Sequence, residues 1–182
     1  LCTLATSVFD GDDYLVPFLQ NAAAVERYED IEHIIVLANS PGREYNTALE
    51  HCIRNPGVVL VWKSDDPGLY NIWNHCDSLA SAPYMGNANI DDKRAPNHLT
   101  ELVRLLETHP DCDVASAGLR VTDEASTTWE RSDGLEEWYT SDAVSTKKGT
   151  DLYKFSDGIP IAHNFPHCLP VWRTSLGSVI GP

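Results

Sequence analysis

The regular alternation of short apolar runs with helix-like stripes limits the possible folds of this chain more than any other feature. Leu4–Phe9, His33–Ala38 and Val58–Lys63 are rich in aliphatic and β-branched residues, and each precedes a stretch with helical spacing. The first such stretch has apolar residues at i, i+3, i+4, i+7 and i+10, namely Leu15, Phe18, Leu19, Ala22 and Val25. This alternation is typical of βαβ units, so the pattern predicts an α/β, Rossmann-like fold with a mostly parallel central sheet flanked by helices.

The same alternation continues to about residue 121. Two further helical stripes run from Leu69 to Ala80 and from Leu99 to Leu106, and Tyr84–Asn89 and Asp113–Val121 are predicted strands. From 122 to about 160 the pattern dissolves into a polar stretch, which we predict to be a long excursion with one short helix. The length of 182 residues and the hydrophobic share of 42% suit one compact domain, residues 1–182.

The charge balance limits the partners of the chain. Thirteen Lys and Arg stand against 27 Asp and Glu, giving a formal charge of −14, so nucleic acid is excluded as an expected partner. An anionic ligand can still bind where a cation or a row of backbone N–H groups reverses the local sign. The apolar runs are shorter than the roughly 20 residues that a spanning helix needs, so no transmembrane segment is expected.

The five cysteines are widely spaced and include no C-x-x-C pair: Cys2, Cys52, Cys76, Cys112 and Cys168. This spacing favours reduced thiols in a cytoplasmic protein over a disulfide framework or a zinc knuckle. His163 and His167 are four residues apart, but Pro166 breaks any helix that would align them, so a zinc site is not expected there.

Asp91 and Asp92 form the most informative polar pair, because they directly follow the predicted strand Tyr84–Asn89. In an open parallel sheet, ligands bind beyond the carboxyl ends of the strands. Two adjacent carboxylates that leave a buried strand repel each other unless a cation joins them, and Mg²⁺ or Mn²⁺ prefers such oxygen ligands. The alternative is that the pair caps the helix predicted to start near Pro96.

Several motifs, taken together, resemble the family 2 glycosyltransferases of the GT-A type. That family has a G-x-Y-x-x-x-N helix start, an A-x-x-Y strand start, an acidic metal motif and a P-x-W-R-x-S-L segment. The corresponding segments of this chain are Gly68–Asn74, Ala80–Tyr84, Asn89–Asp92 and Pro170–Leu176, and its opening Ser7–Leu15 is similar to the family's first strand and turn.

The resemblance implies a role for eight residues. Phe9, Asn39 and Asp66 would surround the nucleotide base of a UDP- or GDP-sugar, and Asn74 would order the nucleotide end of the site. Asp91 and Asp92 would hold Mg²⁺ or Mn²⁺ on the diphosphate, while Trp172 and Arg173 would lie on the sugar or acceptor side. The ordinary alternatives are that Asn74 is a solvated or capping residue and that Trp172 belongs to the core.

The chain departs from the family pattern at two positions, Asn39 and Asn89, where the family usually has an acidic residue. Both keep a carbonyl acceptor and lose a charge, so we expect binding with altered strength. The resemblance further implies an inverting transfer whose general base lies shortly after the P-x-W-R segment. Since no acidic residue follows Asp157, that base is expected beyond Pro182, in a chain that is an incomplete fragment.

Two other functions remain open at this stage. A nucleotidyltransferase shares the layout and the use of a metal, although the first loop, Asp10–Asp13, is acidic where such an enzyme would need a glycine-rich basic loop. A non-catalytic binding module would use the excursion around Trp129 and Trp138 as its contact surface. A lipid-linked, polysaccharide or protein acceptor would each be compatible with the transferase.

Overall fold

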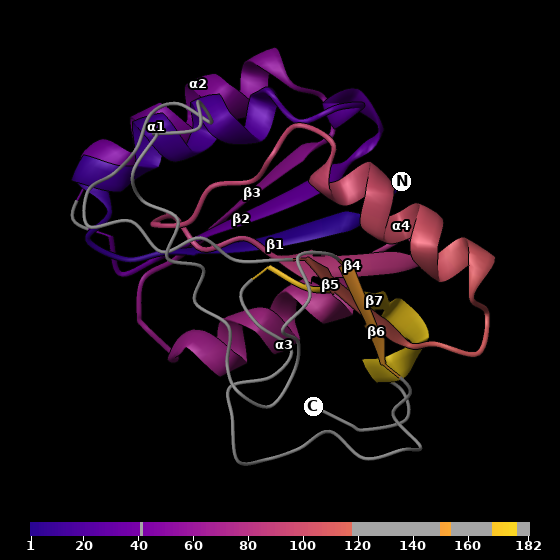
Figure 1. The fold of residues 1–182 in the computed structure, drawn as a ribbon. Helices are drawn as coiled ribbons and strands as arrows, with labels where there is room; N and C mark the ends of the chain where they lie inside the picture. Colours follow the sequence, from indigo (N-terminus) through magenta and orange to yellow (C-terminus); the bar gives the residue numbers. More distant parts are fainter. Residues whose placement is uncertain (41, 118–149, 154–168, 178–182) are drawn as a thin grey trace, which may run out of the picture.

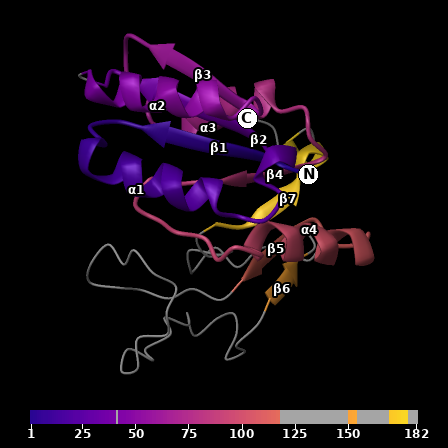
Figure 2. The ribbon, with the colours of Figure 1, turned by 90° about the horizontal axis from the view of Figure 1, so that it is seen from above.

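The computed structural model describes residues 1–40, 42–117, 150–153 and 169–177. The strands in these residues form one seven-stranded sheet. The strand order is β3-β2-β1-β4-β7-β5-β6, as Figure 2 shows. The strands are β1 (Thr3–Val8), β2 (Glu32–Ala38), β3 (Val58–Lys63), β4 (Tyr84–Asn87), β5 (Val114–Ala117), β6 (Thr150–Tyr153) and β7 (Val171–Arg173).

The sheet is mostly parallel, as the sequence predicts. Strand β1 pairs in parallel with β2 and β4, and β2 pairs in parallel with β3. Strand β7 is antiparallel to both β4 and β5, so β5 runs in the same direction as β4, and β6 is antiparallel to β5. Five strands therefore share one direction, and their carboxyl ends lie at one edge of the sheet.

Helices cover both faces of this sheet (Figure 1). They are α1 (Asp12–Ala23), α2 (Arg43–Arg54), α3 (Leu69–Leu79) and α4 (His98–Thr108). One hydrophobic cluster joins residues of α1, α2 and α4 to β1 and β2, and a second joins Ile72 and Cys76 of α3 to the opposite face. None of the helices in the described residues is long and apolar enough to cross a bilayer.

Strand β2 shows why the sheet is covered on both sides. Ile35 and Leu37 belong to the cluster under α1 and α2, whereas Ile34, Val36 and Ala38 belong to the cluster over α3. All five are at most 1% exposed. A strand with both faces buried is apolar at every position, and this explains the continuous run that the sequence shows.

Two short strands were not predicted. Thr150–Tyr153 forms β6 inside the stretch that we predicted as an excursion, and Val171–Arg173 forms β7 inside the P-x-W-R segment. Strands of three or four residues are too short to display a period, so the sequence pattern does not reveal them. Trp129, Trp138, His163, His167 and Cys168 lie outside the described residues.

Candidate functional site

Four loops meet at the carboxyl edge of the parallel strands, and they contain most of the predicted site residues. Phe9 directly follows β1, Asn39 directly follows β2, Asp66 lies between β3 and α3, and the turn Asn89–Asp92 follows β4. Because β3, β2, β1 and β4 are consecutive neighbours in the sheet, these loops are neighbours as well. The structure therefore brings Phe9, Asn39, Asp66 and the two aspartates to one edge, whereas Asn74 lies within α3.

The loop after β1 touches the turn after β4 through one close contact. A Cβ atom added at Gly11 would lie 2.6 Å from Cδ1 of Ile90 and 3.0 Å from Cγ1 of Val8. Carbon atoms prefer separations of about 3.5–4.0 Å, so a larger residue at this position would require the Ile90 side chain to shift. Ile90 thus packs on the backbone of the β1–α1 loop, with Asp91 and Asp92 following it in the chain.

The loop after β2 is joined by hydrogen bonds to the ends of β1 and β3. The Oγ of Ser40 donates to the carbonyl of Val8 at 3.1 Å, and the N–H of Asn39 donates to the carbonyl of Lys63 at 3.0 Å. Asn39 has a φ of 51° and Asp10 a φ of 48°. Asn and Asp adopt this left-handed region more readily than other non-glycine residues, so both loops turn sharply at the ends of their strands.

Phe9 presents a large aromatic ring at this edge. Its relative exposure is 53%, although it directly follows the buried Val8. An exposed aromatic ring beside polar loops offers a flat apolar surface for a planar ring system. This placement is compatible with the nucleotide-base role that the family resemblance implies.

The turn Asn89–Asp92 holds its own two ends together. The N–H of Asp92 donates to the carbonyl of Asn89 at 3.2 Å, and Nδ2 of Asn89 donates to Oδ2 of Asp92 at 2.9 Å. Asp91 is exposed and Asp92 is half-buried. Burial raises the pKa of Asp92 and the charge of Asp91 adds to this, while the hydrogen bond from Asn89 and the charge of Arg94 oppose it.

The helix-capping alternative for the two aspartates is wrong. Helix α4 begins at His98, and its N-cap residue is Asn97, with no side-chain capping hydrogen bond. Five residues separate Asp92 from the first residue of the helix, so neither carboxylate reaches the free N–H groups of its first turn.

The segment that follows the turn is anchored to α1 and to β4. The side chain of Asn21 bonds the backbone of Arg94 twice, donating to its carbonyl at 2.9 Å and accepting from its N–H at 2.8 Å. The buried guanidinium of Arg94 donates from Nη2 to the carbonyl of Asn87, the last residue of β4. Burial lowers the pKa of Arg94 to about 10, so its positive charge persists near Asp92 at neutral pH.

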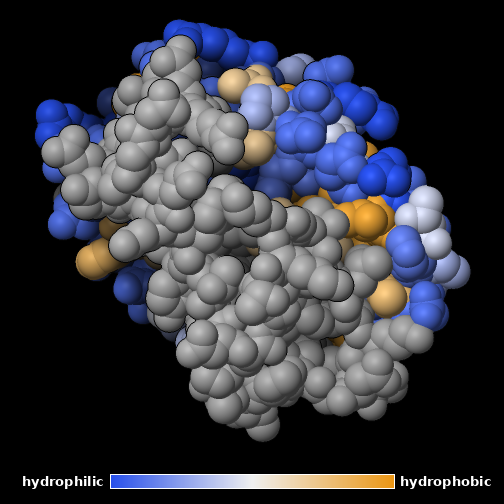
Figure 3. Space-filling model, viewed as in Figure 1, coloured by the Kyte–Doolittle hydropathy of each residue, from blue (hydrophilic) through white to orange (hydrophobic). Residues whose placement is uncertain are grey.

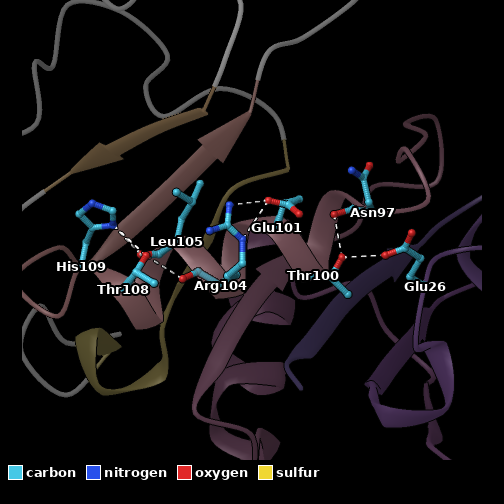
Figure 4. A network of polar contacts seen from close by, with 8 residues as sticks. All are labelled: Glu26, Asn97, Thr100, Glu101, Arg104, Leu105, Thr108 and His109. Carbon is cyan, nitrogen blue, oxygen red and sulfur yellow. Dashed lines mark hydrogen bonds and ion pairs between the residues drawn. The ribbon is translucent and has the colours of Figure 1, made fainter.

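Further contacts extend this anchor into α4. The N–H of Glu26 donates to the carbonyl of Pro96 at 2.7 Å, and Oγ1 of Thr100 donates to the Glu26 carboxylate at 3.1 Å. Figure 4 shows Thr100 joining Glu26 to the carbonyl of Asn97 at the start of the helix. Hydrogen bonds thus hold the segment between the Asn89–Asp92 turn and the start of α4 in place.

Asp66 and Asn74 lie in and after the loop that follows β3. Oδ1 of Asp66 accepts the N–H of Gly68 at 2.9 Å, and Gly68 has a φ of 87° that favours glycine. Asn74 is exposed on α3. Asp66 therefore shapes the entry into α3, and one of its carboxylate oxygens is occupied by that bond.

Trp172 and Arg173 differ from the rest of the predicted set. Strand β7 pairs Arg173 with Tyr84, the first residue of β4, so Arg173 lies toward the amino ends of the parallel strands. Trp172 is half-buried and packs against the cluster on the α3 face, as in the alternative that assigns it to the core. In the pairing of β4 with β7, Trp172 is opposite Met85 and Arg173 is opposite Tyr84.

The guanidinium of Arg173 is occupied by backbone carbonyl groups. It donates to the carbonyl of Leu106 at 2.6 Å and to that of Cys112 at 2.9 Å, and it lies 5.6 Å from the ring centroid of Tyr84. The last carbonyls of a helix carry a partial negative charge and attract such a cation. Arg173 therefore binds carbonyl groups at the end of α4, and its role on the sugar or acceptor side stays a prediction.

Glu44 is a buried group that sequence reasoning missed. It lies in the first turn of α2, is 1% exposed, and accepts backbone N–H groups from two different loops. A single Glu in a helical stripe carries no sequence signal for such a role, because Gly11, the partner in the other loop, is 33 residues away in the chain.

The described residues fit a metal ion only in part. They contain no group of three His, Cys, Asp or Glu that could hold one. Asp91 and Asp92 supply carboxylate oxygens, and Mg²⁺ or Mn²⁺ commonly binds through one or two carboxylates while phosphate and water complete the shell. The donor atoms therefore suit a cation that is shared with a phosphate ligand.

On the face shown in Figure 3, the described residues form a mainly hydrophilic surface with small hydrophobic areas. A cavity of about 330 Å³ lies elsewhere, next to the amino ends of β2 and β3, where Tyr28, Arg54 and Gly57 help to line it. It contains none of the predicted site residues. The candidate site at the carboxyl edge of the sheet is thus identified by its converging loops and its acidic residues, and not by a cavity.

Comparisons with known proteins agree with this arrangement. The family described as glycosyl transferase family 2 matches residues 3–179. Residues 1–349 of S. aureus TarS have a similar structure, with a TM-score of 0.67, 12% identity, and coverage of 98% of this chain and 48% of that one. No match was found among curated proteins.

Two similar structures contain ligands. The mannosyltransferase PcManGT from Pyrobaculum calidifontis, in complex with GDP-Man and Mn²⁺, has a TM-score of 0.58 and 16% identity over 65% of this chain and 35% of that chain. S. aureus TarS 1–349 in complex with UDP-GlcNAc has a TM-score of 0.56 and 14% identity over 62% and 32% of the two chains. The chain thus spans less than half the length of each of these three solved structures.

Proposed function

Since the chain belongs to glycosyl transferase family 2, we propose that it binds a UDP- or GDP-sugar at the carboxyl edge of its sheet and serves an inverting sugar transfer. The observation that carries the proposal is the turn Asn89–Asp92, which contains two carboxylates and packs against the β1–α1 loop through the contact between Ile90 and Gly11. In this proposal Phe9 stacks on the base, and Asn39, Asp66 and Asn74 bind the nucleotide.

The charges at this edge support a need for a metal. The first turn of α1 contains Asp12 and Asp13, and the N–H of Gly11 at its start already donates to Glu44. A helix N-terminus attracts phosphate only while its N–H groups are free and its surroundings are not negative. The start of α1 is therefore a poor site for a diphosphate, and we propose that a cation on Asp91 and Asp92 supplies positive charge for that group.

Each residue has a definite task in the proposed reaction. Asp91 and Asp92 would hold Mg²⁺ or Mn²⁺, and Arg94 anchors the chain next to the turn through the carbonyl of Asn87. A divalent cation, when bound there, neutralises charge that develops on the leaving diphosphate. An inverting transfer also needs a base for the acceptor's proton, and we assign that role to no described residue.

The ligands of the similar structures support the choice of donor and cofactor. PcManGT was solved with GDP-Man and Mn²⁺, and TarS 1–349 with UDP-GlcNAc. Both ligands are nucleoside diphosphate sugars. We therefore propose the same class of donor for this chain, with a divalent cation as cofactor.

We also propose that the protein works in the reducing cytoplasm. Cys2, Cys52 and Cys76 are free thiols in the structure, and Cys2 and Cys76 are buried. Burial raises the pKa of Cys2 to about 11 and that of Cys76 to about 12, so both stay protonated and unreactive. A fractionation experiment that finds the protein in an oxidising compartment would contradict this.

Isothermal titration calorimetry tests the donor proposal. UDP and GDP are titrated into the protein with Mn²⁺, with Mg²⁺ and with EDTA, and the same series is repeated for Asp91→Asn and Asp92→Asn. The exposed Glu107→Gln in the last turn of α4 is the matched control, because it removes the same charge far from the turn.

We expect binding of at least one nucleotide with metal, its loss in EDTA and in both aspartate variants, and wild-type affinity in the control. Equal nucleotide binding with and without metal would contradict the metal role. An absence of nucleotide binding under every condition would instead favour a non-catalytic module.

A further inference from the structure

We infer that Glu44 is a positioning residue that sets the distance between the two nucleotide loops and the metal turn, an inference that rests on the proposed function. Its carboxylate connects the loop after β1 to the loop after β2. Oε1 accepts the N–H of Gly11 at 3.0 Å, and Oε2 accepts the N–H of Gly42 at 3.3 Å. One side chain therefore bonds both loops that contain the proposed base-binding residues Phe9 and Asn39.

The burial of Glu44 shows that these bonds are essential to its placement. The residue is 1% exposed, and no ion pair to it occurs among the described residues. A buried carboxylate without a cation is costly unless hydrogen-bond donors and dipoles compensate its charge. Gly11 and Gly42 are the N-cap residues of α1 and α2, so the positive ends of two helix dipoles meet at this one carboxylate.

The effect of Glu44 extends from the loops to the metal turn. Gly11, held by Oε1, is the residue against which Ile90 packs. Ile90 in turn lies between Asn89 and Asp91 in the turn. A shift of Gly11 therefore moves the surface that supports the two aspartates, and Glu44 aligns the base-binding loops with the metal-binding turn.

The chemistry of the carboxylate makes the inference specific. Two acceptor oxygens are needed, because both partners are N–H donors. Glu44→Gln keeps the shape but turns an NH₂ group toward one of these donors, so one bond is lost and two donors face each other. Glu44→Asp keeps both acceptors but shortens the side chain by one methylene, so it cannot span both loops.

The test measures loop protection and nucleotide affinity in the same variants. Amide hydrogen exchange by NMR follows the N–H groups of Gly11 and Gly42, and calorimetry measures the binding of UDP or GDP with Mn²⁺. The matched control is Glu50→Gln, a change of the same kind on the same helix at an exposed carboxylate that pairs with Arg54. The free energy of unfolding is measured for each variant by urea denaturation.

In Glu44→Gln we expect faster exchange at Gly11 or Gly42 and about tenfold weaker nucleotide binding, the change that corresponds to one lost hydrogen bond to a charged group of about 1.4 kcal/mol. The control should match the wild type in both. The melting temperature of each variant must lie well above the assay temperature. If Glu44→Gln does not fold, the comparison is made with Glu44→Asp.

The outcomes separate this inference from the proposed function. Wild-type exchange and wild-type affinity in Glu44→Gln would overturn the positioning role and leave the donor proposal intact. If the wild-type protein binds no nucleotide, the proposed function fails, while faster exchange at Gly11 or Gly42 would still support the link between the loops. Unchanged exchange in that case would overturn both.

Discussion

Replacement of Gly11 by alanine tests whether the β1–α1 loop and the metal turn are packed against each other. The backbone of Gly11 has φ −101° and ψ 14°, which alanine can adopt, so the effect arises from the new methyl group alone. That methyl would lie 2.6 Å from Cδ1 of Ile90 and 3.0 Å from Cγ1 of Val8. Ile90 must then withdraw by about 1 Å to restore a normal carbon–carbon separation.

The expected cost follows from overpacking. Extra methyl groups in a packed site usually cost about 1–3 kcal/mol, and the reduced entropy of the unfolded chain returns about 0.4–1 kcal/mol for a Gly→Ala change. We expect Gly11→Ala to lower the free energy of unfolding by about 1–2 kcal/mol. For a domain of this size the melting temperature should fall by roughly 2–8 °C.

A double-mutant cycle with Ile90→Val identifies the cause, because valine lacks the Cδ1 methyl that collides. Ile90→Val alone should cost about 0.5–1.5 kcal/mol. In its presence, Gly11→Ala should be less destabilising by about 1 kcal/mol, as measured by urea unfolding with tryptophan fluorescence. Costs that add to within about 0.3 kcal/mol would show that the two loops are not in contact, and the reasoning would be refuted.

Three further results are expected. Phe9→Ala should weaken nucleotide binding about 5- to 150-fold in calorimetry through the loss of base stacking, while the similarly exposed Ile53→Ala should leave it unchanged. Arg173→Ala should lower the urea midpoint, because the carbonyls of Leu106 and Cys112 lose their donor, but should not alter nucleotide affinity; a large loss of affinity would support a role at the site. Burial lowers the pKa of His33 and of His98 to about 3, so both side chains are neutral in the folded protein. The free energy of unfolding should therefore fall as the pH drops from about 6.5 toward 3, and it should fall less steeply in His98→Leu. An equal dependence on pH in the variant and the wild type would contradict the buried, neutral state of His98.

The strands and helices that form the core could be predicted because their pattern is local. Val58–Lys63 was predicted with the bounds that β3 has in the structure, and the stripe from Leu99 to Leu106 lies within α4. In α4, burial imposes a helical period that the chain itself displays, whereas the edge strand β3 is recognised by its run of β-branched and aliphatic residues. The predicted strand Tyr84–Asn89 ends two residues early, at Asn87, because the chain turns there toward Asp91.

The site could be predicted only where its residues follow strands directly. Phe9 and Asn39 directly follow β1 and β2, and Asp91 lies in the turn that follows β4. A parallel sheet brings the ends of its neighbouring strands to one edge. Glu44 and Arg173 could not be assigned, because their roles depend on partners that are 33 and 67 residues away in the chain. For Arg173 the decisive fact was the antiparallel insertion of β7 between β4 and β5, which no local pattern indicates.

Paramagnetic broadening by Mn²⁺ tests the central claim most directly. With UDP or GDP present, substoichiometric Mn²⁺ is added to the labelled protein, and amide NMR signals are followed across the described residues. We predict selective broadening at Asp91, Asp92 and Gly11, with Gly57 at the opposite edge of the sheet unaffected. Broadening confined to other acidic surfaces, or none at the Asn89–Asp92 turn, would contradict a metal–diphosphate site at the carboxyl edge.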